Sequence, residues 1–316
     1  MGFAVESIRG LLGRARRVWS TRGAGGIAQA FAWRLRARFY EARRWWYRDH
    51  PVVGWFVELS GNRVRIEGCR FHVSHPQISR AIKSRLLRGR YERSELQVLK
   101  QWLSPDSPVI ELGGGIGVVS TLVNRRLREP AKHVVVEANP ALIPVIDEQR
   151  VRNAASFTIV HAAVDYSGDE CVPLEVGRDF LSSRTAGTGD GPSVPAVTLQ
   201  GLLRRYPWHE ATLICDIEGA ETELVAREGE LLGRHFHTLV LEIHPEFRSA
   251  AECEELLTRL DALGFREVAC VRKVHAFRQS PTSDAVRGVP WAGCIPPPCR
   301  PAARGASRDD CEDASN

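Results

Sequence analysis

The chain has 316 residues, 43% hydrophobic and 26% charged, a composition typical of a globular protein with a full α/β core. No stretch of about 18 apolar residues is free of charge, which argues against a transmembrane helix. Arginines interrupt the apolar run that a signal peptide would need, so we expect a cytoplasmic protein. The eight cysteines show neither a CxxC pair nor zinc-like spacing, and we expect reduced thiols and no metal site.

The net charge of +5 is distributed unevenly along the chain. Residues 1–50 contain eleven arginines and no lysine against three acids, so this segment carries +8 and the remainder −3. We expect one or two basic helices here, the second over about 27–48, with tryptophans among the arginines. Such a segment suits a peripheral membrane contact or another anionic surface. Packing of the same helix on the rest of the chain is an equally open alternative.

The next segment, residues 51–88, predicts a small lead-in domain. Short strands are expected at 52–53, 57–59, 64–66 and 71–73, followed by a helix over about 77–88. A further helix over about 92–103 lies in a main domain that we expect to span 89–280. The proline-rich and charged residues 281–316 predict a tail that is disordered from Pro296 onward.

From residue 109 onward, strands and helices alternate. The expected strands lie at 109–112, 133–137, 157–162, 211–216, 237–243, 265–271 and 273–278. The expected helices lie at 117–127, 140–152, 198–205, 219–228 and 250–263, and residues 163–198 are expected to be irregular. This alternation predicts an α/β fold with a doubly wound, mainly parallel seven-stranded sheet, Rossmann-like, carrying a basic helical N-terminal extension.

The clearest candidate binding site is the glycine-rich turn that follows the first strand of this sheet. Gly113, Gly115 and Gly117 allow a sharp backbone turn and a close approach to a ligand. The dinucleotide fingerprint G-x-G-x-x-G fails because Val118 stands where its third glycine is needed. Glu111, two residues before the first glycine, would oppose a pyrophosphate but suits a phosphate-free cationic nucleoside. S-adenosylmethionine is such a ligand.

Acidic and polar residues at the ends of the next two strands extend this candidate site. Glu137 ends the second strand, where a carboxylate can accept hydrogen bonds from ribose hydroxyls. Asn139 is a further candidate, although it can equally cap the helix that begins near Pro140. Ala163 and Asp165 follow the third strand, where an adenine ring would lie. A turn at Ser167 explains Asp165 equally well.

The candidate catalytic residues follow the fourth and fifth strands. Asp216 and Glu218 stand at alternate positions ahead of a helix, and either could remove the proton of an acceptor hydroxyl. Glu242 and His244 share a strand face, and His244 titrates near neutrality, which suits a general base. A histidine that merely caps the strand before Pro245 is an equally open alternative, and the spacing of these acids and His244 does not demand a metal. Glu221 is interpreted as an ordinary acid in the first turn of a helix.

Together these segments resemble the FkbM-type methyltransferases, a branch of the class I S-adenosylmethionine-dependent methyltransferases. The resemblance covers about residues 89–270 and is most specific at 216–221, 137–140 and 242–245. It implies O-methylation of a sugar or metabolite hydroxyl, with Asp216 and Glu218 at the reaction centre. The cofactor contacts that it implies are Glu111, Gly113, Gly115 and Glu137, and Tyr91 and Glu92 resemble a lead-in motif that closes over the cofactor.

The sequence departs from this family at one position that bears on catalysis. A lysine often precedes the aspartate of the fourth-strand motif, and this chain has Cys215 there. Two other functions remain open: an NAD(P)-dependent oxidoreductase, and a non-catalytic protein that binds an anionic surface through residues 1–50. A nucleic acid is the less expected partner. The acceptor is expected to contact residues 52–90 and 170–195, including Ser182, Ser183 and Arg184.

Overall fold

The computed structural model describes residues 51–175, 184–185 and 191–280. The helices expected within 1–50 and the tail expected at 281–316 lie outside the described residues, as do Ser182 and Ser183. The described chain divides into two compact units, the first formed by residues 51–64 and 78–91 and the second by 65–77 and 92–280. Within these residues, no helix combines the length and the apolarity that crossing a bilayer requires.

The first unit is built around two helices, α2 (Pro51–Leu59) and α3 (Arg80–Leu87). The short strands expected at 52–53 and 57–59 are therefore wrong. Their valines favour strands by local propensity, but Val53 and Val57 are buried at helical spacing. Gly54 permits the close packing of the two helices, since a Cβ there would lie 2.0 Å from the carbonyl oxygen of Arg80.

A two-stranded sheet follows, formed by β1 (Arg63–Ile66) and β2 (Cys69–His72). Glu67 and Gly68 between them both have positive φ, as a tight hairpin turn requires. The strands expected at 64–66 and 71–73 are confirmed to within one or two residues.

The second unit contains a seven-stranded sheet in the order β12-β13-β11-β10-β3-β4-β5. Its strands are β3 (Val109–Leu112), β4 (His133–Glu137), β5 (Thr158–His161), β10 (Ala211–Cys215), β11 (Phe236–Glu242), β12 (Phe265–Val271) and β13 (Val274–Gln279). The pairs among β3, β4, β5, β10 and β11 are parallel, and only β13 runs antiparallel to its neighbours β11 and β12. This strand order with a reversed seventh strand is the class I methyltransferase fold, so the expected fold class is confirmed.

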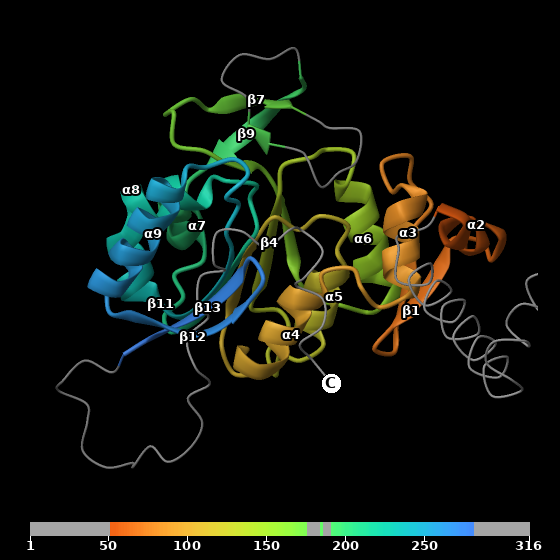
Figure 1. Cartoon of the computed structure of the whole chain (residues 1–316), viewed down its shortest axis with the longest axis horizontal. Helices are drawn as coiled ribbons and strands as arrows, with labels where there is room; N and C mark the ends of the chain where they lie inside the picture. Colours follow the sequence, from red (N-terminus) through yellow and green to blue (C-terminus); the bar gives the residue numbers. More distant parts are fainter. Residues whose placement is uncertain (1–50, 176–183, 186–190, 281–316) are drawn as a thin grey trace, which may run out of the picture. The chain divides into compact units, whose positions relative to one another are not determined.

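Helices cover both faces of this sheet (Figure 1). One face packs on α7 (Leu199–Arg205), α8 (Glu221–His235) and α9 (Ala250–Ala262), and the other on α4 (Arg93–Trp102), α5 (Val118–Asn124) and α6 (Ile143–Arg152). Helix α8 continues well past the expected end at residue 228. The helix is kinked at Glu228, the expected end, and the next residue, Gly229, allows close packing on the end of α9, because a Cβ there would lie 2.8 Å from the Leu263 side chain.

The segment expected to be irregular, 163–198, contains a second small sheet, so that expectation is wrong. Its strands pair in the order β6-β9-β7-β8 and comprise β6 (Ala163–Val164), β7 (Cys171–Glu175), β8 (Arg184–Thr185) and β9 (Ser193–Val197). Val172, Leu174 and Val194 form its buried core. Prolines and polar residues interrupt these short strands, and tertiary pairing overrides the turn signal.

The position of β3 defines where a ligand would bind. Its neighbours β4 and β10 lie on opposite sides, so the chain reverses its direction of winding there. In open α/β sheets, ligands bind beyond the carboxyl ends of the strands at such a point. The segments that follow β3, β4, β10 and β11 are those that carry the residues singled out from the sequence.

Candidate functional site

The glycine turn after β3 is held directly against the end of β10. Gly113 has φ +94°, and a Cβ at this position would lie 1.8 Å from the carbonyl oxygen of Asp216. The amide N–H groups of Gly113 and Gly114 both donate to the carbonyl of Val136 at the end of β4. The turn therefore brings the ends of three neighbouring strands together, as the sequence predicts.

Glu137 is bound to this turn. Its Oε2 accepts a hydrogen bond from the amide of Gly115 at 2.7 Å, and its Oε1 accepts one from the amide of Asn139 at 2.7 Å. Burial raises the pKa of Glu137 to about 7, although these backbone hydrogen bonds oppose the shift. Each carboxylate oxygen has a second lone pair, so the geometry leaves acceptor capacity for hydroxyl groups of a ligand.

Glu111 has a different environment from the one that the sequence suggested. Its side chain is 2% exposed, its Oε1 accepts from the hydroxyl of Ser120 at 2.6 Å, and its Oε2 lies 3.0 Å from Nε2 of His133. A ligand would have to displace one of these partners to reach the carboxylate. The structure therefore assigns Glu111 to the interior beneath the turn, and direct contact with a cofactor stays a prediction.

We expect Ser120→Ala to lower the free energy of unfolding by about 1–3 kcal/mol, because it leaves a buried carboxylate oxygen without its donor. Ligand affinity at the glycine turn should change little. Urea unfolding and calorimetry on the same preparation measure the two effects. A variant of normal stability whose ligand affinity is strongly reduced would contradict the structural role of Glu111.

The other predicted cofactor residues are distributed around the same strand ends. The amide of Ala141 donates to Oδ1 of Asn139 at 3.0 Å, which forms a local turn. Helix α6 begins only at Ile143, with Leu142 at its N-cap and no side-chain cap, so the expectation that Asn139 caps it is wrong. Ala163 is buried in β6. Asp165 accepts from the amide of Ser167 at 2.8 Å, so its side chain forms the expected turn. Tyr91 belongs to the first unit, and its contact with a cofactor stays a prediction.

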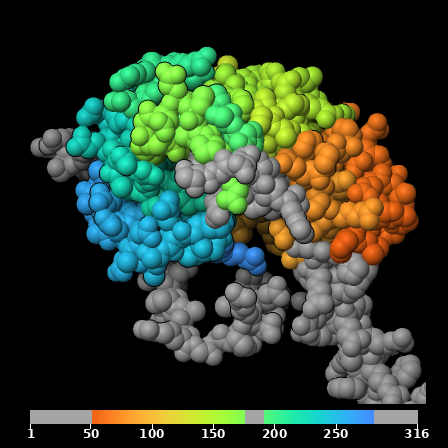
Figure 2. Space-filling model, turned by 90° about the horizontal axis from the view of Figure 1, so that it is seen from above, coloured from red at the N-terminus to blue at the C-terminus, as the bar shows by residue number. Residues whose placement is uncertain are grey.

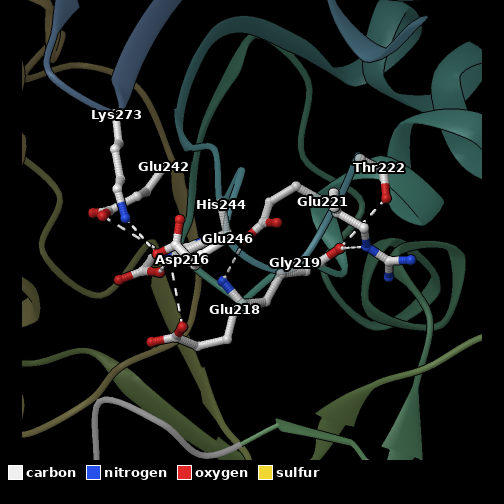
Figure 3. Close-up of polar contacts among 11 residues, drawn as sticks. Asp216, Glu218, Gly219, Glu221, Thr222, Glu242, His244, Glu246 and Lys273 are labelled. Atoms are coloured by element: carbon white, nitrogen blue, oxygen red, sulfur yellow. Dashed lines mark hydrogen bonds and ion pairs between the residues drawn. The ribbon is translucent and has the colours of Figure 1, made fainter. Parts of the chain in front are cut away.

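The structure brings Asp216, Glu218 and His244 together (Figure 3). Nε2 of His244 lies 3.4 Å from Oδ1 of Asp216 and 3.6 Å from Oε2 of Glu218. Oδ1 of Asp216 is buried and has no hydrogen-bond partner within the described parts of the chain. Its contact with His244 is an ion pair without a hydrogen bond, so this buried oxygen can still accept a hydrogen bond from a ligand.

Glu221 is the functional residue that the sequence analysis misjudged. It is 1% exposed, and its Oε1 lies 3.2 Å from Nδ1 of His244 while accepting the amide of Ile217 at 2.9 Å. It therefore fixes both the imidazole and the loop after β10. The signal was its position five residues after Asp216, which places it at the start of α8, facing the strand ends.

Further acids surround this group. A carboxylate oxygen of Glu242 lies 3.9 Å from Nε2 of His244, and Glu92, Asp216 and Glu242 have donor atoms within 4.8 Å of one another. Glu92 therefore lies near the site, as predicted, and its contact with a cofactor stays a prediction. Glu95 on α4 belongs with Tyr91 and Glu92 to the lead-in motif that the family resemblance indicates, and burial and neighbouring acids raise its pKa well above the usual range.

The acids and the histidine shift one another's protonation. Burial alone would lower the pKa of His244, but the hydrogen bond and charge of Glu221, with the charges of Asp216 and Glu218, raise it to about 9. Burial raises the pKa of Glu218 to about 7 against the opposing charge of His244, and burial also raises that of Asp216. His244 is therefore a cation at neutral pH, and Glu218 fits the role of a base better than His244 does.

The loop that carries Glu218 is held in an unusual backbone conformation. Glu218 has φ +53°, a left-handed conformation that non-glycine residues rarely adopt, and Gly219 follows with φ +103°. Nε of Arg248 donates to the carbonyl of Gly219 at 2.7 Å, which helps to hold the loop. Such strain is concentrated at functional sites, where it orients a side chain.

Position 215, where the FkbM-type methyltransferases often have a lysine, is a cysteine in this chain, but other residues place positive charge near the acids. Cys215 is fully buried in the sheet, and burial raises the pKa of its thiol well above the usual range. His244 supplies a cation next to both acids. Lys273, which lies between β12 and β13, forms an ion pair with Glu246 (Figure 3). Burial raises the pKa of Glu242, and the charges of His244 and Lys273 oppose this shift.

Three groups of side chains within the described residues have the donors and spacing that a cation would need. Two of them share Asp216, one with Glu218 and His244 and the other with Glu92 and Glu242. The third, Glu267, Cys270 and His275, lies on the β12–β13 hairpin. The expectation of no resident metal stays a prediction.

Comparison with known proteins gave matches among solved structures only. No family model matches the sequence, and no curated protein matches it either. Similar structures include a ribosomal protein L11 methylase from Lactobacillus delbrueckii subsp. bulgaricus, with 9% identity and a TM-score of 0.37 over 59% of this chain and 77% of that one.

Two further similar structures are also methyltransferases. Magnesium protoporphyrin IX methyltransferase from Synechocystis PCC 6803, crystallised with bound SAM, shows 12% identity and a TM-score of 0.38 over 63% of this chain and 83% of its own. A putative O-methyltransferase from Klebsiella pneumoniae shows 11% identity and a TM-score of 0.35, covering 60% and 80%. The strand order identifies the fold independently of these weak similarities.

Proposed function

We propose that the protein is an S-adenosylmethionine-dependent methyltransferase. The observation that carries the proposal is the buried Oδ1 of Asp216, which lies 3.4 Å from Nε2 of His244 but forms no hydrogen bond within the described residues, at the strand end that contacts the glycine turn. A cationic ligand with an N–H donor satisfies this atom, whereas a diphosphate would meet several carboxylates. The FkbM resemblance supports the same cofactor.

The residues that would hold this cofactor follow from their chemistry. Glu137, fixed at the turn by two backbone amides, has the remaining acceptor capacity that ribose hydroxyls need. Gly113 cannot carry a side chain without striking Asp216. The acids around His244 suit a positive charge, and S-adenosylmethionine supplies an electrophilic methyl group on a sulfonium.

The chain itself would handle the proton of the acceptor. We assign proton removal from an acceptor hydroxyl to Glu218, whose pKa of about 7 lies near the operating pH. Glu221 holds the imidazolium of His244 between Asp216 and Glu218, which keeps the two acids close despite their repulsion. An acceptor with a sugar or metabolite hydroxyl agrees with the resemblance to the FkbM-type enzymes.

We expect Glu137→Ala to weaken binding of S-adenosylmethionine by roughly 10-fold to 100-fold, as the loss of one or two charge-assisted hydrogen bonds implies. Calorimetry measures the effect. Glu129→Ala is the matched control, since this exposed acid precedes β4 at its other end. Unchanged affinity in Glu137→Ala would remove this residue from the ribose role.

Methyl transfer tests the proposal directly. The full chain is incubated with methyl-labelled S-adenosylmethionine and a panel of hydroxylated sugars and metabolites, with and without EDTA. We expect S-adenosylhomocysteine and a labelled ether product, unaffected by chelation. Reduction or oxidation of an acceptor with NAD(P) instead would establish the oxidoreductase alternative, and absence of turnover together with binding to anionic surfaces would favour the non-catalytic one.

A further inference from the structure

Helix α2 exposes an apolar stripe on the side that faces away from α3. Its buried residues are Val53, Gly54 and Val57, and this face packs on α3. The large side chains of its other face are exposed by 42–64% and follow the spacing i, i+3, i+4, i+7, comprising Val52, Trp55, Phe56 and Leu59. The rings of Trp55 and Phe56 contact each other edge to face, with centroids 5.4 Å apart.

The only charged residue of α2 does not interrupt this stripe. Glu58 forms ion pairs with Arg80 and Lys83 of α3, at 2.9 and 3.0 Å. The exposed face of α2 is therefore apolar along its whole length. A helix that is apolar on both faces usually packs on its own domain with one face and contacts another apolar environment with the other.

The first unit has a net positive charge. The described residues of the first unit contain one acid, Glu58, against six basic residues, namely Arg63, Arg80, Lys83, Arg85, Arg88 and Arg90. The sequence immediately before α2, residues 1–50, adds a net charge of +8 and three tryptophans in its second half. The rest of the chain, outside residues 1–50 and the first unit, carries a net negative charge. Figure 2 shows the surface of residues 51–91, which comprise the described first unit and residues 65–77 of the second, in red and orange.

We propose that the exposed face of α2 inserts into the interface of a membrane that contains anionic lipids. Tryptophan and phenylalanine suit the boundary between headgroups and acyl chains, and the net positive charge of the first unit and of residues 1–50 attracts anionic headgroups. Nine residues rise only about 14 Å, roughly half of a hydrocarbon core, so α2 lies on the membrane and does not cross it.

Other occupants fit this face less well. A nucleic acid would make polar contacts and would leave Leu59 and Phe56 in water. Four half-exposed side chains offer far less than the roughly 800 Å² per partner that a stable dimer needs. The inference rests on the exposed face of α2 and on the positive charge of the first unit and of residues 1–50, and is independent of the proposed methyl transfer.

Vesicle flotation of the full chain tests this inference. We expect it to float with phosphatidylcholine vesicles containing phosphatidylglycerol, more weakly with phosphatidylcholine alone, and less at high salt. The combined variant Trp55→Ser, Phe56→Ser and Leu59→Ser should lose roughly tenfold or more of this binding. Leu59 and Val151 are exposed to nearly the same extent, 64% and 67%, so their serine variants form a matched pair. Leu59→Ser should weaken vesicle binding, and Val151→Ser should not.

A second measurement separates a loss of membrane contact from a loss of folding. Brominated lipids should quench the tryptophan fluorescence of the wild type and quench Trp55→Phe less, while both keep the same thermal melt. Absence of vesicle binding by the wild type would overturn the inference, and so would full binding by the triple variant. RNA or DNA binding in place of vesicle binding, or a dimer that the triple variant abolishes, would also overturn it.

Discussion

Gly113→Ala is expected to lower the free energy of unfolding by about 3 kcal/mol or more and to abolish cofactor binding. The added Cβ would lie 1.8 Å from the carbonyl oxygen of Asp216, in a residue with φ +94°. The backbone cannot move aside easily, because Asp216 donates to Leu112 at 2.9 Å and Gly113 donates to Val136 at 2.9 Å. Urea unfolding and calorimetry measure the two losses.

The chain offers a close control for this substitution. Gly168 has nearly the same φ, +93°, but no heavy atom lies within 4 Å of the position that its Cβ would take. Gly168→Ala should therefore cost only the backbone strain, about 1–2 kcal/mol, and leave ligand affinity unchanged. Equal effects of the two substitutions would show that the contact with Asp216 does not constrain the turn.

Glu218→Gln is expected to lower kcat/KM for methyl transfer by roughly 100-fold to 10,000-fold, the usual contribution of a general base. The wild-type kcat/KM should rise with pH through about 7, as Glu218 loses its proton, and fall above about 9, as His244 loses its own. In Glu218→Gln the lower limb of this profile should disappear. Initial rates measured from pH 5 to 10 give both results.

A second acid separates this role from a general effect of charge. Glu223 lies on α8 and pairs with Arg227 at 2.8 Å, outside the group around His244. Glu223→Gln should keep the wild-type rate and pH profile. If Glu218→Gln retained the rising limb near pH 7, another group would have to be the base.

The sequence predicted the main sheet well because its strands are buried on both faces and appear as short apolar runs between helices. Val134, Val135 and Val136 in β4 are one example, all of them fully buried. The glycine turn was equally visible, since three positive φ angles require three glycines. The acids that follow β10 and β11 lie close together, as predicted, because the carboxyl ends of parallel strands lie at the same edge of the sheet.

The errors came from contacts between segments far apart in the sequence. Val52 and Val53 favour a strand locally, but packing of Gly54 on Arg80 makes this segment helical. Glu221 looks like a surface acid until α8 places it beside His244. The side chain of Glu111 was expected to face the ligand, yet Ser120 and His133 hold it inside. None of these partners is a sequence neighbour.

Calorimetric titration of the full chain with S-adenosylmethionine and, separately, with NAD tests the central claim most directly. A cationic, phosphate-free nucleoside should bind at the glycine turn, and Glu137→Ala should weaken that binding while Glu129→Ala leaves it intact. NAD should give no signal, because acids surround the strand ends. Binding of NAD together with no binding of S-adenosylmethionine would contradict the account.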